Sequence, residues 1–275
     1  MAQIKPMRRP KRPRLSLNVM IPNMLTLMAL CSGLTAVRFA YEGRWEHAVL
    51  AILAAAILDA LDGRIARLLK GTSKFGAELD SLSDMICFGV APGLMLYFWS
   101  LETLGRFGWI LVLLYAVACV LRLARFNTAV EDPEPPAWSS TFFTGVPSPA
   151  AAGLVLLPMI VSFHVLEEYA RRPEVVAVFM ALVSFLMVSR IPTYSFKKVK
   201  LRPSLILPLM VAVGLIAASM ISAPWVTLSG LLVAYMISIP LAIRSYRAIC
   251  QRTGACDDDS ARAPIDIDLD GDTRI

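Results

Sequence analysis

Four aspartates at regular spacing are the residues of this sequence most suited to chemistry. Asp59 and Asp62 stand three residues apart, and Asp80 and Asp84 stand four apart. On helices, each pair would share one face. The stretch 70–73 between the pairs reads K-G-T-S, which suits a turn. Two antiparallel helices joined there would point four carboxylates at one another.

Four unneutralised carboxylates cannot sit together in a medium of low dielectric constant. A divalent cation, or two cations bridged by shared carboxylates, would remove the repulsion. Ligands that are all oxygen favour Mg²⁺ or Mn²⁺. Two such ions about 3.5–4 Å apart are a common device for phosphoryl transfer. The spacing therefore predicts a divalent-metal site that acts on a phosphate-bearing substrate.

Small and basic residues lie among the four aspartates. Gly63 follows Asp62, and Gly76 lies one turn before Asp80. Glycine inside a helix is costly unless something must approach the backbone closely. Ala66 keeps the same helix face small, and Arg67 is suited to bidentate contact with a phosphate. These residues favour a nucleotide as part of the substrate.

The elements that must position these residues are membrane spans. The chain has 275 residues, 57% of them hydrophobic and 17% charged, and this balance excludes a soluble enzyme and a disordered chain. Its long unbroken apolar runs exclude a β-barrel, whose strands alternate. About 20 apolar residues make one spanning helix. Eight such blocks occur, at about 21–41, 47–66, 82–100, 107–124, 146–165, 173–191, 204–221 and 224–243. We therefore expect an all-α polytopic membrane protein.

The distribution of basic residues predicts the orientation. With the N-terminus inside, 22 of the 27 Lys and Arg fall in inner segments. The positive-inside rule then places both termini and the aspartates at the cytoplasmic side of a bacterial-type inner (plasma) membrane. We expect the basic N-terminus to face anionic lipid rather than nucleic acid. The expected domains are the cytoplasmic N-terminus 1–20, a transmembrane core 21–200, two extra spans 201–243 and an acidic, disordered cytoplasmic tail 244–275.

Residues 59–84 read D-A-L-D-G-R-I-A-R, then eight residues, then G-A-E-L-D-S-L-S-D. The run resembles, at every specified position, the signature D-x2-D-G-x2-A-R-x8-G-x3-D-x3-D of the CDP-alcohol phosphotransferase family. The resemblance implies an integral membrane enzyme that displaces CMP from a CDP-linked donor, usually CDP-diacylglycerol, with an alcohol. It also implies a core of six transmembrane helices, a homodimer and two metal ions at the cytoplasmic side.

The resemblance also implies roles for single residues. Asp59, Asp62 and Asp80 would be metal ligands. Asp84 would be the general base that takes the proton of the acceptor hydroxyl, and it would also touch a metal. CDP and its phosphates would contact Gly63, Ala66, Arg67 and Gly76. Asn23 and Thr26, one turn apart on an apolar helix, are expected to contact the nucleotide or phosphate as well.

Further segments resemble the phosphatidylserine synthase branch of this family, namely 22–27, 80–93, 122–127, 143–151 and 195–198. The branch implies transfer of a phosphatidyl group from CDP-diacylglycerol to L-serine, giving phosphatidylserine and CMP in phospholipid biosynthesis. The residues expected to bind the acceptor or the lipid phosphate are Arg122, Arg125, Asn127, Lys197 and Lys198. The two arginines are equally explained as part of the positive inner surface.

Two alternatives remain open from the sequence. The same reaction could use another acceptor: glycerol 3-phosphate, inositol phosphate or choline. Intramembrane carboxylates also mark ion pathways, so an ion transporter is a more remote alternative. The aspartates cluster at one face of the membrane, and no polar path leads to the other face. This pattern favours the enzyme.

Overall fold

The computed structural model describes residues 17–69, 71, 73–131, 142–165, 167–189, 192–194 and 206–253. Helices dominate these ranges, which confirms the all-α class. Residues 1–16 of the predicted N-terminal segment and 254–275 of the predicted tail lie outside them. The helical elements are α1 (Leu17–Tyr41), α2 (Trp45–Leu68), α3 (Lys74–Asp84), η1 (Met85–Val90), α4 (Ala91–Trp99), η2 (Leu101–Leu104), α5 (Arg106–Glu131), α6 (Ser148–Val155), α7 (Leu157–Ser162), α8 (Glu167–Ala170), α9 (Pro173–Val188), α10 (Ile206–Ser222) and α11 (Pro224–Thr253).

Several helices are long and apolar enough to cross a membrane. Within the described residues they are Val19–Tyr41, Lys74–Trp99, Arg106–Thr128 and Pro224–Leu241, with shorter apolar helices at Pro173–Val188 and Leu207–Ser222. In α2 the apolar stretch is interrupted by Asp59 and Asp62. Large apolar side chains such as Met24, Ile110 and Val178 are exposed, as expected for surfaces that face lipid. The chain is therefore a polytopic membrane protein.

Three boundaries differ from the predicted spans. The third helical segment begins at Lys74 rather than near 82, because the Ser73 side chain caps the helix by accepting a hydrogen bond from the backbone N–H of Gly76. The fifth segment is divided at Leu156, just before a proline in the first turn of α7. The last helix continues beyond 243 to Thr253.

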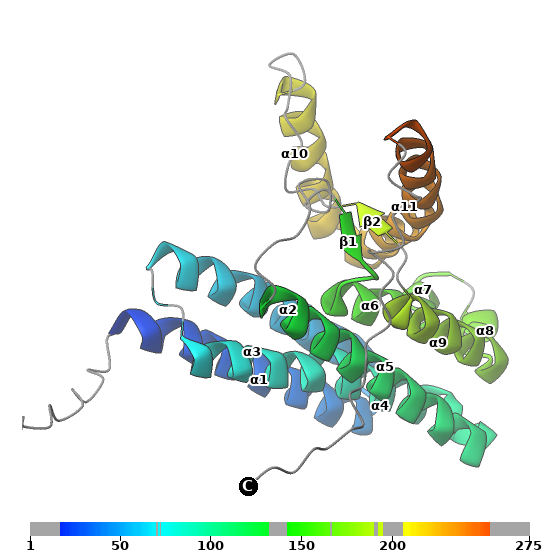
Figure 1. Cartoon of the computed structure of the whole chain (residues 1–275). Coiled ribbons are helices and arrows are strands. Elements are labelled where there is room, and N and C mark those ends of the chain that lie inside the picture. Colours follow the sequence, from blue (N-terminus) through cyan, green and yellow to red (C-terminus); the bar gives the residue numbers. More distant parts are fainter. Residues whose placement is uncertain are drawn as a thin grey trace, which may run out of the picture.

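The first helices form the part of the molecule that carries the aspartates. Helix α1 packs along α2 and also contacts α3 and α4, while α5 packs against η1 and α9 (Figure 1). The approach of α1 to η1 is close at Gly33, where an added Cβ would lie 2.6 Å from the sulfur of Cys87. The carboxylate-bearing helices α2 and α3 are therefore both held against α1.

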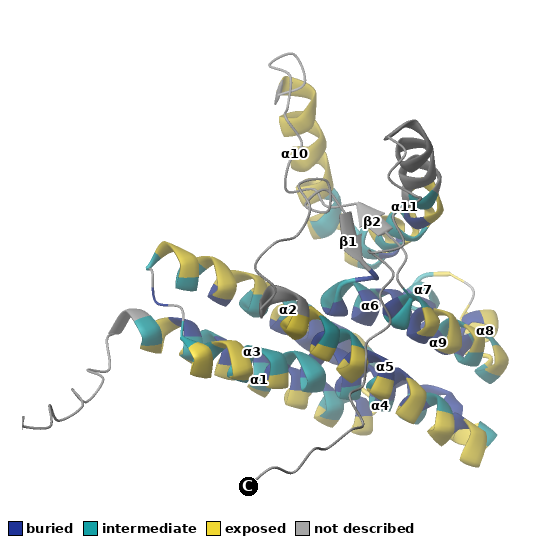
Figure 2. Ribbon diagram, viewed as in Figure 1, coloured by how far each residue is buried: buried dark blue, intermediate teal, exposed yellow. Residues whose placement is uncertain are grey.

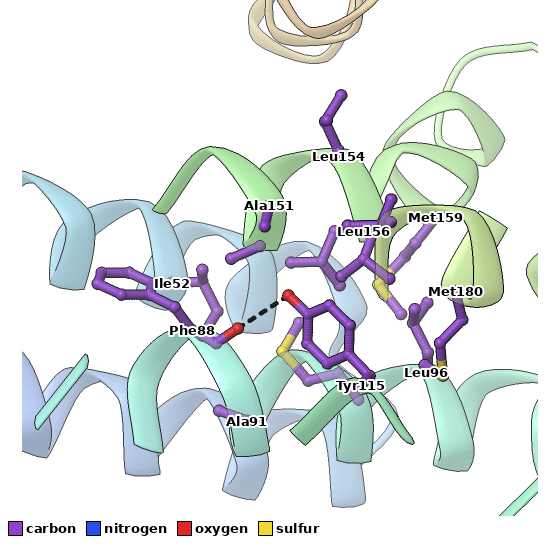
Figure 3. Packing of buried hydrophobic residues seen from close by; sticks show 14 of the residues in the cluster. Ile52, Phe88, Ala91, Leu96, Tyr115, Ala151, Leu154, Leu156, Met159 and Met180 are labelled. Atoms are coloured by element: carbon purple, nitrogen blue, oxygen red, sulfur yellow. Dashed lines mark hydrogen bonds between the residues drawn. The ribbon is translucent and has the colours of Figure 1, made fainter. Parts of the chain in front are cut away.

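The segment that follows Asp84 is a π-helical turn, η1, rather than a continuous α-helix. Pro92 has no N–H to offer the carbonyl of Phe88 four residues earlier. The buried hydroxyl of Tyr115 on α5 donates to that carbonyl instead, at 2.9 Å (Figure 3). This bond connects the middle of the third span to α5, four residues after Asp84.

The C-terminal helices extend from the rest of the described structure. Two short strands, β1 (Phe142–Thr144) and β2 (Pro192–Tyr194), pair antiparallel. Helix α11 contacts β2, α6 and α7. Helix α10 packs against α11 and is exposed along most of its length (Figure 2). Lipid or another protein surface must cover α10, because its exposed side chains are largely apolar.

Candidate functional site

The predicted aspartates converge in the structure. Carboxylate oxygens of Asp59, Asp62 and Asp80 all lie within 4.8 Å of one another. The Asp59 carboxyl is also in hydrogen-bond contact with those of Asp80 and Asp84. The i,i+3 pair on α2 and the i,i+4 pair on α3 therefore face each other, as their spacing predicts.

This group of carboxylates fits a divalent cation. Asp62 is buried, and the other three are half-buried. Among the described residues, the ion pairs involve Arg38, Arg44 and Glu42, so no basic side chain lies within 4 Å of the four aspartates. Carboxylates at such separations repel one another unless a proton or a cation lies between them. The oxygen-only donor set matches hard cations such as Mg²⁺ or Mn²⁺.

Helix α1 contributes to the site through Thr26. The buried Thr26 hydroxyl donates to Oδ2 of Asp62 at 2.6 Å. The Ser83 hydroxyl on α3 in turn donates to the backbone carbonyl of Thr26 at 3.4 Å. These bonds tie three helices together at the carboxylates. Ser83 was not predicted, because a serine within a helix gives no sequence signal of a partner 57 positions away.

A cavity of about 190 Å³ opens beside the aspartates. Among the residues expected to hold CDP, Asn23, Thr26, Gly63, Ala66 and Gly76 line it. Asp62 and Asp80 form part of its wall, which joins the cavity to the carboxylates. The remaining lining residues, which the sequence did not single out, are Pro22, Gly71, Ser73 and Ala77.

The two glycines of the cavity do different things. An added Cβ at Gly76 would lie 2.8 Å from Oδ1 of Asn23, so Gly76 allows α3 to approach α1. An added Cβ at Gly63 would meet nothing within 4 Å. Gly63 therefore leaves open space on the cavity wall, where a bound molecule can approach the backbone.

Arg67 lies outside the cavity lining. Its side chain is exposed, and its Nε donates to the carbonyl of Gly63 at 2.9 Å. The terminal nitrogens of the guanidinium stay close to the cavity mouth through this bond. A contact between Arg67 and a phosphate remains an expectation.

The three polar residues near the C-terminal end of α5 have separate partners. Arg122 Nη1 donates to Oγ of Ser148 at 2.5 Å, and its charge interacts with Asp84. Arg125 Nη1 donates to the carbonyl of Val188 at 2.8 Å, which ties α5 to the end of α9. Asn127 Nδ2 donates to Oγ of Ser81 on α3 at 3.0 Å. Lys197 and Lys198 lie outside the described residues.

Ser148 is a site residue that the sequence reasoning did not single out. It begins α6 between two prolines and is fully buried against Arg122. A serine at a helix start is usually explained by capping. The sequence Pro-Ser-Pro therefore predicts a helix start at Ser148 but does not indicate a role in the site.

Comparison with known proteins places the chain among phospholipid-synthesising enzymes. Residues 19–239 match the family model described as CDP-alcohol phosphatidyltransferase. The CDP-diacylglycerol–serine O-phosphatidyltransferase of Mycobacterium tuberculosis is 39% identical over 248 residues, covering 90% of this chain and 86% of the relative. The enzyme of the same name from Helicobacter pylori is 37% identical over 199 residues, covering 72% and 81%. That from Bacillus subtilis is 35% identical over 178 residues, covering 65% and 92%. The family match extends past 200 and into the first half of α11.

Proposed function

The chain belongs to the CDP-alcohol phosphatidyltransferase family, and we propose that it transfers the phosphatidyl group of CDP-diacylglycerol to the hydroxyl of L-serine. The products are phosphatidylserine and CMP, and the reaction belongs to phospholipid biosynthesis. The observation that carries this proposal is the cluster of Asp59, Asp62 and Asp80, two of which, Asp62 and Asp80, line a cavity together with the signature's small residues. Relatives named for this reaction cover up to 90% of the chain.

We propose that Asp59, Asp62, Asp80 and Asp84 hold two divalent cations, Mg²⁺ or Mn²⁺. When bound, the ions offset the negative charge of the diphosphate and of the leaving CMP. The contact of Asp59 with both Asp80 and Asp84 suits a carboxylate shared between two ions. The hydrogen bond from Thr26 restrains the orientation of the Asp62 carboxylate.

Asp84 is the proposed general base. The serine hydroxyl oxygen attacks the phosphorus that carries the diacylglycerol, and Asp84 accepts the hydroxyl proton. The bond between that phosphorus and the bridging oxygen breaks, and CMP leaves with the bridging oxygen. Asp84 interacts electrostatically with Asp59 and with Arg122 of α5.

The cavity residues are proposed to hold the CMP part of the donor. Asn23 and Thr26 offer polar atoms, and Gly63, Ala66 and Gly76 leave room for the ribose and base. Arg67 is proposed to contact phosphate at the cavity mouth. Arg122, Arg125, Asn127, Lys197 and Lys198 remain proposals for binding the acceptor or lipid phosphate.

Orientation, domain division and assembly are further proposals. The excess of Lys and Arg in the inner segments supports a cytoplasmic site and cytoplasmic termini. The core 21–200 and the extra spans 201–243 are proposed as separate units of the fold. The family resemblance supports a homodimer. Labelling of single introduced cysteines in intact cells and light scattering of the purified protein test the topology and the dimer, respectively.

The decisive experiment for the reaction is an acceptor panel. Purified full-length protein receives CDP-diacylglycerol, Mn²⁺ and one of serine, glycerol 3-phosphate, inositol phosphate or choline, and CMP release is followed. We expect serine to release CMP fastest, and a chelator to abolish the release. If another alcohol releases CMP while serine gives no more than water, the acceptor assignment is wrong and the family chemistry stands.

A further inference from the structure

Two buried polar atoms lie without a partner near the inner end of α5. In the part of the chain that the structure describes, the buried side-chain atoms lacking a hydrogen-bond partner are Arg122 Nε, His164 Nδ1 and Tyr235 Oη. Arg122 and Tyr235 also interact electrostatically with each other. Their helices, α5 and α11, both contact α6. A buried donor without a partner is costly, so two such donors on neighbouring helices indicate a missing ligand.

The ligand that Arg122 lacks is an anion. Its side chain is half-buried, and Nη1 donates to the neutral Ser148 hydroxyl. No carboxylate of the described residues lies within 4 Å of it. A half-buried charge whose nearest opposite charge, Asp84, lies beyond ion-pair distance favours an additional anionic partner. The guanidinium is therefore placed to receive a negatively charged group.

Tyr235 reaches this region from the last helix. Helices α6 and α11 are in close contact, since an added Cβ at Gly153 would lie 2.8 Å from Cδ2 of Leu232. Tyr235 lies one turn after Leu232 and packs against the core. Ser148, the partner of Arg122, begins the same helix α6. Helix α6 therefore connects the helix that carries Tyr235 with the residue that bonds Arg122.

We propose that the Tyr235 hydroxyl and Nε of Arg122 together bind the carboxylate of the acceptor amino acid. This inference rests on the proposed function and assigns α11 a part in choosing the acceptor. Both groups are donors, and a carboxylate accepts from both. The acceptor hydroxyl would then point toward Asp84, because in serine the carboxylate and the hydroxyl extend from neighbouring carbons.

The test is Tyr235→Phe in the full-length enzyme with saturating Mn²⁺. A lost hydrogen bond to a charged group should raise KM for serine by about 10- to 100-fold. We expect kcat to change less than about threefold, because no group at the reacting atoms is altered. KM for CDP-diacylglycerol should stay the same. If KM for CDP-diacylglycerol rises instead, Arg122 and Tyr235 bind a phosphate of CDP-diacylglycerol and the proposal is wrong.

A second acceptor separates binding from folding. Serinol has the amine and hydroxyl of serine but no carboxylate. CMP release with serinol should be the same for Tyr235→Phe and wild type, whereas release with serine falls. Arg122→Lys keeps the charge but removes Nε and the Nη1 bond to Ser148, so its loss of release with serine should exceed its loss with serinol. The double variant should lose less than the product of the two single losses, because both side chains bind one group. If the loss in the double variant equals the product of the two single losses, the side chains act independently and the proposal is wrong.

Thermal unfolding distinguishes a Tyr235 that binds serine from a Tyr235 that only supports the fold. Without serine, Tyr235→Phe should be at least as stable as wild type, because the hydroxyl has no partner. The rise in Tm on adding serine should be lost. Tyr97→Phe on α4, whose ring packs against Trp109, is the matched control and should leave both KM values unchanged. Wild-type turnover with serine is measured first, so failure of the proposed reaction is seen separately.

Discussion

The hydroxyl of Thr26 donates a 2.6 Å hydrogen bond to Oδ2 of Asp62. Helix α1, which carries none of the aspartates, therefore sets the orientation of one of them. Outer partners of this kind commonly contribute 10- to 100-fold to metal affinity, because they fix a ligand before the ion arrives.

Thr26→Val keeps the shape of the side chain and removes the donor. We expect metal affinity to fall about 10- to 100-fold, with turnover recovering as Mn²⁺ is raised. The measurement is CMP release against Mn²⁺ concentration. Thr35→Val is the control, because the Thr35 hydroxyl bonds within α1 to the carbonyl of Cys31 at an exposed position. A Mn²⁺ requirement unchanged in Thr26→Val would remove Thr26 as an orienting residue.

Asp84→Asn tests the general base. The amide cannot accept the serine proton, so kcat should fall about 10²- to 10⁴-fold. Metal binding, measured by calorimetry, should be largely kept, since Asp59, Asp62 and Asp80 form a cluster without it. Glu78→Gln, an exposed acid on the same helix, should behave as wild type. Retained turnover in Asp84→Asn would show that another group takes the proton.

Gly63→Ala tests whether the open space beside Gly63 is filled by the donor. Folding should be unaffected or improved, because the added methyl group meets nothing and alanine favours helix. Overpacking of bound CDP-diacylglycerol by about 1–3 kcal/mol should raise its KM by about 5- to 100-fold. Gly214→Ala on α10 is the matched control, since its added Cβ also meets nothing. If Gly63→Ala and Gly214→Ala have the same KM for CDP-diacylglycerol, the nucleotide does not occupy the space beside Gly63.

Tyr115→Phe tests the bond that supports the π-helical turn. Loss of the hydroxyl leaves the buried Phe88 carbonyl without this donor, and unfolding free energy should fall by about 1–3 kcal/mol. Thermal unfolding of the detergent-solubilised protein measures this. The comparison with Tyr235→Phe is informative, because one variant removes a bonded hydroxyl and the other an unbonded one. Equal stability of Tyr115→Phe and wild type would mean that the carbonyl has another partner.

The convergence of the aspartates could be predicted because it depends on helix periodicity alone. Spacings of three and four place side chains on one face, and the turn between the pairs is short. The sequence does not predict the start of α3, because Ser73 suits a turn as well as a helix cap. The π-helical turn was also missed, although Pro92 and Gly93 after an apolar run are a signal of an irregular helix.

Contacts between distant helices could not be predicted from spacing. Thr26 and Asp62 lie 36 positions apart, and Asn127 and Ser81 lie 46 apart. Each partner has an ordinary structural explanation in its own helix, so the pairing exists only once the helices are packed. Tyr235 is the extreme example, because aromatic residues are common in apolar spans and its buried hydroxyl is visible only in the folded chain.

The cavity and the carboxylates are built entirely from residues between Pro22 and Asp84. During synthesis these residues leave the ribosome before α5 and long before α11, and N-terminal regions generally fold first. The cavity and the carboxylate cluster can therefore assemble early in membrane insertion. A nascent chain acquires Arg122 next and Tyr235 later, so the proposed acceptor-binding pair is synthesised only after the carboxylate cluster.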